Sequence, residues 1–161
     1  MDFSTIPWEI AKDAIDSLVA ETLEYCDDRF SITFHGGGEA FVEFKLLRRC
    51  VEYARQQAQS HNLHVRFSTV TNATLITQEI AVWMKDVGFT NITVTLDCAQ
   101  DVNDCQRPKA SGNGSFGDVM EGIQNISRAG LKFSLRSTVT NLGVSRMAEF
   151  VEFVAREIFP K

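Results

Sequence analysis

The sequence predicts an α/β fold built around about four parallel β-strands. Helical and extended patterns alternate along the 161 residues, and successive strand patterns lie about 30 residues apart, which leaves room for a helical crossover between them. Such crossovers join parallel strands. About four strands are too few to close an ordinary eight-stranded barrel. The pattern alone therefore leaves two possibilities, a small open sheet or a part of something larger.

The alternation begins with a helix. Apolar residues recur at helical spacing over residues 8–25, and Pro7 stands just before them, where proline suits the first turn. A strand is expected over residues 30–34 and a second helix over residues 46–60. The later elements alternate in the same way, with strands expected over 63–69, 92–96 and 131–139 and helices over 77–87, 116–129 and 145–158.

Nearly all unusual residues lie where strands end. His35-Gly36-Gly37-Gly38-Glu39 follows the first strand, Asn72 follows the second, Asp97 follows the third, and Arg136 lies in the fourth. Glycine removes the Cβ atom, so the backbone can approach a ligand closely. The helix-to-strand connections, by contrast, have the composition of plain turns. This asymmetry predicts a ligand site at the carboxyl ends of the strands.

The composition excludes several classes of function. A net charge of −5 without any run of Lys and Arg argues against a nucleic-acid partner or an anionic membrane surface. No long apolar run and no signal peptide are present, which predicts a cytoplasmic location and no membrane span. The length predicts a single domain over residues 1–161. The 4 cysteines are scattered without a CxxC pair, which favours reduced, packed thiols.

Several motifs in a fixed order carry a resemblance to a known family. They are His35-Gly36-Gly37-Gly38-Glu39, Thr71-Asn72, Thr95-Leu96-Asp97, Asp104 with Arg107-Pro108, Gly112-Asn113-Gly114-Ser115-Phe116, and Arg136-Ser137-Thr138-Val139-Thr140. From about Trp8 to the C-terminus the chain resembles the radical S-adenosylmethionine (SAM) superfamily. More narrowly, it resembles the maturase-type branch that includes anaerobic sulfatase-maturating enzymes and other SPASM-domain peptide modifiers. The resemblance implies a partial TIM-like (βα) barrel with its helices on the outer face.

The resemblance also implies a cofactor, SAM, and residues that bind it. The glycines and Glu39 would meet the amino group, because carbonyl and carboxylate oxygens suit an ammonium. Thr95 takes the place of a family serine that contacts the ribose, and the planar fork of Arg107 would pair with the carboxylate. The implied cofactor-binding residues are Gly36, Gly37, Gly38, Glu39, Asn72, Thr95, Asp97, Arg107 and Arg136.

The chain departs from the family pattern at four places. Ala40, Ala73 and Cys98 stand where the family has proline, glycine and glycine, and the cluster-binding CxxxCxxC motif is absent. A [4Fe–4S] cluster needs thiolates at close spacing. The sequence is therefore expected to be the middle portion of an intact parent that would hold the cluster and modify a peptide or protein. The chain alone is expected to be inactive, with exposed sheet edges that invite self-association.

Two alternatives remain open. The chain would be a cluster-free α/β binding or scaffold domain of the same fold if it is a complete gene product. A metal site built from His35, Asp97 and Asp104 is a minor alternative, since imidazole and carboxylates suit several metals.

Overall fold

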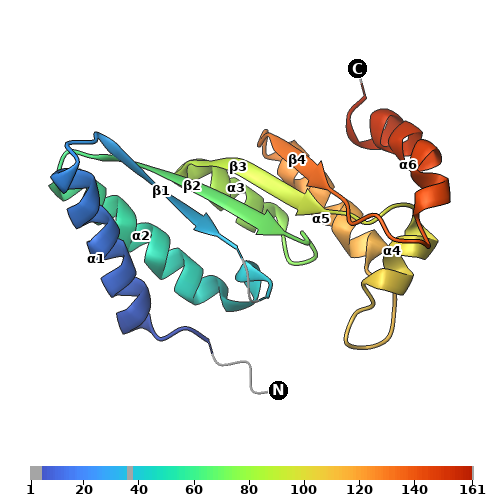
Figure 1. Cartoon of the computed structure of the whole chain (residues 1–161), viewed down its shortest axis with the longest axis horizontal. Coiled ribbons are helices and arrows are strands. Elements are labelled where there is room, and N and C mark those ends of the chain that lie inside the picture. Colours follow the sequence, from blue (N-terminus) through green and yellow to red (C-terminus); the bar gives the residue numbers. More distant parts are fainter. Residues whose placement is uncertain (1–4, 36–37, 161) are drawn as a thin grey trace.

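The computed structural model describes residues 5–35 and 38–160, and it contains one sheet of four parallel strands in the order β1-β2-β3-β4 (Figure 1). The strands are β1 (Arg29–Phe34), β2 (His64–Thr71), β3 (Phe89–Thr95) and β4 (Phe133–Arg136). The α-helices are α1 (Trp8–Glu24), α2 (Phe44–Ser60), α3 (Gln78–Val87), α4 (Gln100–Gln106), α5 (Phe116–Arg128) and α6 (Met147–Phe153). The predicted α/β alternation is confirmed.

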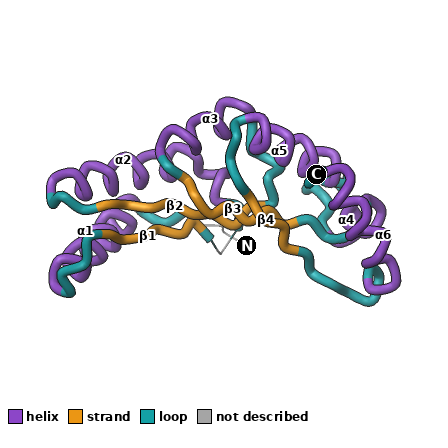
Figure 2. Tube along the Cα trace, turned by 90° about the horizontal axis from the view of Figure 1, so that it is seen from above, coloured by secondary structure: helices purple, strands orange, loops and turns teal. Residues whose placement is uncertain are grey.

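One face of the sheet is covered by helices and the other is not. Figure 2 shows α2, α3 and α5 along one side of the strands, while α1 lies beside β1 and packs on α2. The side chains that fill the space between helices and sheet are fully buried, among them Val51, Phe67, Val94 and Ile126. No described helix covers the opposite face, which exposes the other set of strand side chains.

The helix expected over residues 77–87 is α3, and its two ends are fixed by local contacts. Thr77 precedes it and accepts a hydrogen bond from the Ile80 backbone N–H through its hydroxyl oxygen at 3.3 Å. Gly88 follows it with a φ of 92°, the left-handed conformation that glycine adopts without strain. A polar cap before the apolar stripe and a glycine after it therefore fix both ends.

Two predicted elements differ clearly from the structure, and one helix was not predicted. The strand expected over 131–139 is only Phe133–Arg136, because the backbone N–H of Thr138 bonds to Asp97 instead of a neighbouring strand. The region after β3 contains α4, a short polar helix without an apolar period. The last helix is divided into a 3₁₀ turn (Val144–Arg146), α6 and a wider π turn (Val154–Ile158).

The loop after β2 lies directly against α5. A Cβ atom added at Gly122 would stand 2.1 Å from the carbonyl oxygen of Ala73. The loop backbone therefore occupies the space that a side chain at this position of the helix would need. Gly117 lies on the same helix, and nothing is within 4 Å of its Cβ position. The packing of α5 therefore depends on glycine at one position and not at the other.

Gly122→Ala should lower the free energy of unfolding by about 2–3 kcal/mol, because the Ala73 loop has to move. Gly117→Ala is the matched control and should raise it by up to about 1 kcal/mol, since alanine favours a helix. Denaturant unfolding of both variants measures the difference. Equal effects of the two substitutions would contradict this packing.

The outer edges of β1 and β4 are unpaired among the described residues. Unpaired backbone on a sheet edge invites pairing with another chain, so we expect self-association that grows with protein concentration. Ser31→Lys puts a charge on the exposed side of β1 and should reduce the association. Ser127→Lys on the exposed side of α5 is the matched control. Light scattering that reports a monomer at all concentrations would refute the expectation.

Candidate functional site

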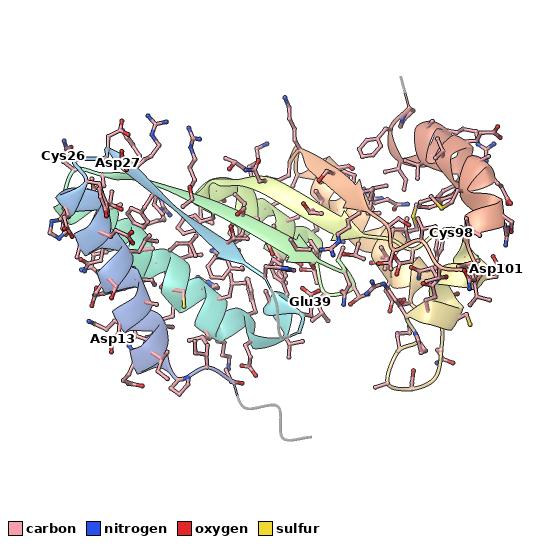
Figure 3. The ribbon with its side chains drawn as sticks, viewed as in Figure 1. Asp13, Cys26, Asp27, Glu39, Cys98 and Asp101 are labelled. Carbon is pink, nitrogen blue, oxygen red and sulfur yellow. The ribbon has the colours of Figure 1, made fainter. Side chains whose placement is uncertain are left out.

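The carboxyl ends of the four parallel strands lie together at one end of the sheet, called the carboxyl edge here, and the predicted site residues that the structure describes lie along it. The parallel register aligns Phe34 with Thr69, Thr71 with Val94, and Thr95 with Arg136. In Figure 3, Glu39, Cys98 and Asp101 lie on the side where the strand arrows end, whereas Cys26 and Asp27 lie at the start of β1. The edge therefore collects residues that are far apart in the sequence.

The first group at this edge is the Glu39 cluster, made of Glu39, Thr71 and Asn72. Oε1 of Glu39 accepts a hydrogen bond from the Thr71 hydroxyl at 2.7 Å, and Oε2 accepts one from the Asn72 backbone N–H at 2.8 Å. Oε1 also receives a longer bond, 3.4 Å, from the Phe41 N–H at the start of the 3₁₀ turn Ala40–Glu43. The carboxylate of Glu39 thus joins the loop after β1 to the end of β2.

The turn after β2 is held by its own side chains. Oδ1 of Asn72 accepts hydrogen bonds from the backbone N–H and the hydroxyl of Thr74, which is an Asx turn. Ala73 has a φ of 60°, in the left-handed region. The turn therefore keeps a conformation that suits glycine although the sequence has alanine there, at a cost of about 1 kcal/mol.

The second group is the Asp97 cluster, made of Asp97, Arg107 and Thr138. The side chain of Asp97 is 2% exposed; Oδ2 accepts from Arg107 Nε at 2.5 Å, and Oδ1 accepts from the Thr138 N–H at 2.6 Å. Arg107 itself is 38% exposed. Among the described residues, its Nη nitrogens make no hydrogen bond, so they are available to an anion at the surface.

A buried amide supports the Asp97 cluster, and the sequence did not indicate it. Asn103 on α4 is 0% exposed; its Oδ1 accepts from the Asp97 N–H, and its Nδ2 donates to the hydroxyl oxygen of Ser115. Ser115 in turn donates to the carbonyl of Arg107. The available signal was Asn103 beside the apolar Val102, in a helix of only 7 residues, which is too short for a helical period to be recognised.

Thr95 and Arg136 lie side by side on the uncovered face of the sheet, because they are register partners on β3 and β4. Two pairs of hydroxyl side chains lie on the same face. The hydroxyl oxygens of Thr33 and Ser68 are hydrogen-bonded at 2.7 Å, and those of Thr93 and Ser134 at 3.3 Å. Sequence analysis missed this row. Its signal was the alternation of Ser or Thr with apolar residues in the strands.

Gly36 and Gly37 lie outside the described residues, and Gly38 is exposed. A cavity of about 970 Å³ lies between α1, β1 and α2 and reaches the carboxyl ends of the strands at His35, Gly38 and Glu39. Its lining includes neither Thr95 nor Arg107.

The charged groups beyond the edge link α4 to α6. Arg146 binds Asp101 and Glu149, and its hydrogen bonds hold the pKa of each carboxyl below the usual value. Within residues 5–35 and 38–160, no three His, Cys, Asp or Glu side chains converge to hold a metal ion. No helix of the described part is long and apolar enough to cross a membrane.

Asn103→Leu should lower the free energy of unfolding by about 2–3 kcal/mol, because it leaves the buried N–H of Asp97 without an acceptor. Asn141→Leu, at an exposed position in the loop before α6, is the control and should change it by less than about 0.5 kcal/mol. Thermal or denaturant unfolding tests both. A loss for Asn103→Leu no larger than that of the control would show that the network is not stabilising.

Comparison with known proteins identifies relatives of the whole chain. The family model of the radical SAM superfamily matches residues 4–154. The mycofactocin maturase MftC of Mycolicibacterium smegmatis is 32% identical over 147 residues, which cover 90% of this chain and 33% of the relative. A cysteine-type anaerobic sulfatase-maturating enzyme of Clostridium novyi is 24% identical over 132 residues, covering 82% and 34%. The matched part of the chain covers between 28% and 51% of the length of these and the other curated relatives.

A solved structure has the same fold. It is described as native anSMEcpe with bound AdoMet and Cp18Cys peptide; its TM-score is 0.83 at 18% identity, and the match covers 94% of this chain and 40% of that one. This likeness confirms the expected partial TIM-like α/β arrangement. The family match extends over nearly the whole chain, and the chain belongs to the radical SAM superfamily.

Proposed function

We propose that this chain forms the SAM-binding part of an enzyme that modifies a peptide or protein. The observation that carries the proposal is the arrangement of Arg107. Its Nε is fixed on the buried carboxylate of Asp97, while its Nη nitrogens make no hydrogen bond within the described residues and its side chain is 38% exposed, at the edge where Thr95 also ends its strand. A guanidinium fixed in this way is preorganised to bind a carboxylate through two parallel hydrogen bonds.

The predicted residues fit the parts of SAM. The loop of Gly36, Gly37, Gly38 and Glu39 would receive the amino end, Thr95 a ribose hydroxyl, and Arg107 the carboxylate. The remaining predicted residues are Asn72 after β2, Asp97 after β3 and Arg136 at the end of β4. SAM supplies the reactive sulfonium when it is bound, and the residues of this chain bind and orient it.

An iron–sulfur cluster does not fit the described residues. Cys26 and Cys105 are exposed, Cys50 and Cys98 are buried, and no group of three metal ligands is present in the described part. Burial raises the pKa of Cys50, which makes it a poorer thiolate. The sequence has no CxxxCxxC motif, so we expect this chain by itself to bind SAM without cleaving it.

A peptide or protein substrate is supported by the relatives and by the uncovered face. Two relatives are named maturases or maturating enzymes, and the solved neighbour is described with a bound peptide. The hydroxyl row on the uncovered face (Thr33, Ser68, Thr93 and Ser134) offers hydrogen bonds to a polar chain. A cytoplasmic location and a single domain over residues 1–161 remain predictions.

Calorimetry with two ligands tests the proposal. SAM should bind weakly, and Arg107→Ala should weaken it by about tenfold or more, because a charge-assisted pair is lost. The variant should not change the binding of 5′-methylthioadenosine, which has the adenosine but lacks the amino-acid part. Arg48→Ala, which removes an exposed arginine from α2, is the matched control.

Two results would contradict the proposal. One is the absence of any SAM binding by the unaltered chain at millimolar ligand. The other is an equal loss for SAM and for 5′-methylthioadenosine in Arg107→Ala, which would show that Arg107 does not meet the carboxylate.

A further inference from the structure

We propose that Glu39 and Asp97 are positioning residues: each carboxylate fixes the loop after one strand to the backbone beyond the end of the next strand, and neither binds the ligand directly. The inference rests on the proposed function, because it concerns the same edge of the sheet. It differs from the expectation that the Glu39 carboxylate meets an ammonium group.

The contacts of Glu39 leave it little capacity for a ligand. A carboxylate has about four acceptor positions, and three of those of Glu39 are taken by Thr71, Asn72 and Phe41. Thr71 is 2% exposed, so this partner cannot touch a ligand at the surface. Its hydroxyl oxygen also accepts the Ala73 N–H at 2.9 Å, which connects Glu39 to the turn after β2.

Asp97 is engaged in the same way on the other pair of strands. Asp97 as a whole residue is 1% exposed. Its Oδ1 accepts a hydrogen bond from the Thr138 N–H, and its Oδ2 accepts one from Arg107 Nε. Thr138 lies just beyond the end of β4, as Asn72 lies just beyond the end of β2. An ion this deeply buried needs both partners, since an unpaired buried carboxylate is costly.

The two carboxylates therefore repeat one arrangement. The loop after β1 is fixed to the end of β2, and the loop after β3 is fixed to the end of β4. Direct contact with a ligand then falls to groups that these clusters orient, namely the outer nitrogens of Arg107, the hydroxyl of Thr95 and the backbone of the loops.

The partners of the two carboxylates predict opposite responses to amide substitution. In Glu39→Gln the amide oxygen can accept the Asn72 N–H, and the amide NH₂ can donate to the Thr71 hydroxyl oxygen, because a hydroxyl both donates and accepts. Only the long contact of 3.4 Å from the Phe41 N–H is lost. In Asp97→Asn the NH₂ must face either the Thr138 N–H or the Arg107 Nε–H. Both of these are donors only, so one contact is always lost.

The test measures SAM binding by calorimetry on the full chain. Glu39→Gln and Thr71→Ser should keep the affinity within about threefold, whereas Glu39→Ala, Thr71→Val and Asp97→Asn should weaken it by about fivefold or more. Asp13→Asn removes an exposed carboxylate on α1 and is the matched control, with no change expected. Rescue by the conservative variants separates positioning from charge.

The opposite pattern would overturn the inference. If Glu39→Gln loses as much affinity as Glu39→Ala while Thr71→Val has no effect, Glu39 binds the ligand by its charge, and the proposed function stands. If the unaltered chain binds no SAM, the proposed function fails, and melting temperatures decide the inference. Asp97→Asn should then lower the melting temperature by several degrees more than Glu39→Gln. Equal shifts would refute it.

Discussion

The buried carboxylate of Asp97 is the interaction on which the rest of the site depends. The Thr138 N–H and Arg107 Nε donate to it, and a buried carboxylate without such partners is costly. These contacts end β4 early, join the residue after α4 to the loop after β3, and hold Nε of a guanidinium whose side chain is 38% exposed. One desolvated charge thus shapes two loops and prepares an anion-binding group between them.

The rest of the edge follows from parallel strands. Their carboxyl ends meet at one side of the sheet, so loops that are distant in sequence become neighbours. The turns there keep a left-handed backbone at Ala73 and Cys98, although neither residue is glycine. Such strain is tolerated where surrounding contacts determine the conformation, and here Asn72, Asn103 and the two carboxylates provide those contacts.

The sequence predicted the elements that have their own periodic signal and missed those that depend on distant contacts. The periodic patterns of α2 and α3 were readable because they are local. The helix α4 was not, because the hydrogen bonds of its buried Asn103 go to Asp97 and Ser115, which lie 6 and 12 residues away. The short β4 likewise reflects the contact of Thr138 with Asp97 across 41 residues. The roles of Glu39 and Asp97 as partners of backbone N–H groups needed coordinates, since sequence shows a carboxylate but not its donors.

The central claim is that SAM binds along the carboxyl edge of these strands, between the Glu39 and Asp97 clusters. Amide chemical shifts of the isotopically labelled chain during titration with SAM test it most directly. The account predicts that the largest shifts fall on Gly38, Asn72, Leu96 and Arg107, with Asn62, Gly88 and Gly130 at the opposite edge unchanged. Shifts confined to that opposite edge, or to the apolar cavity between α1 and β1, would contradict it.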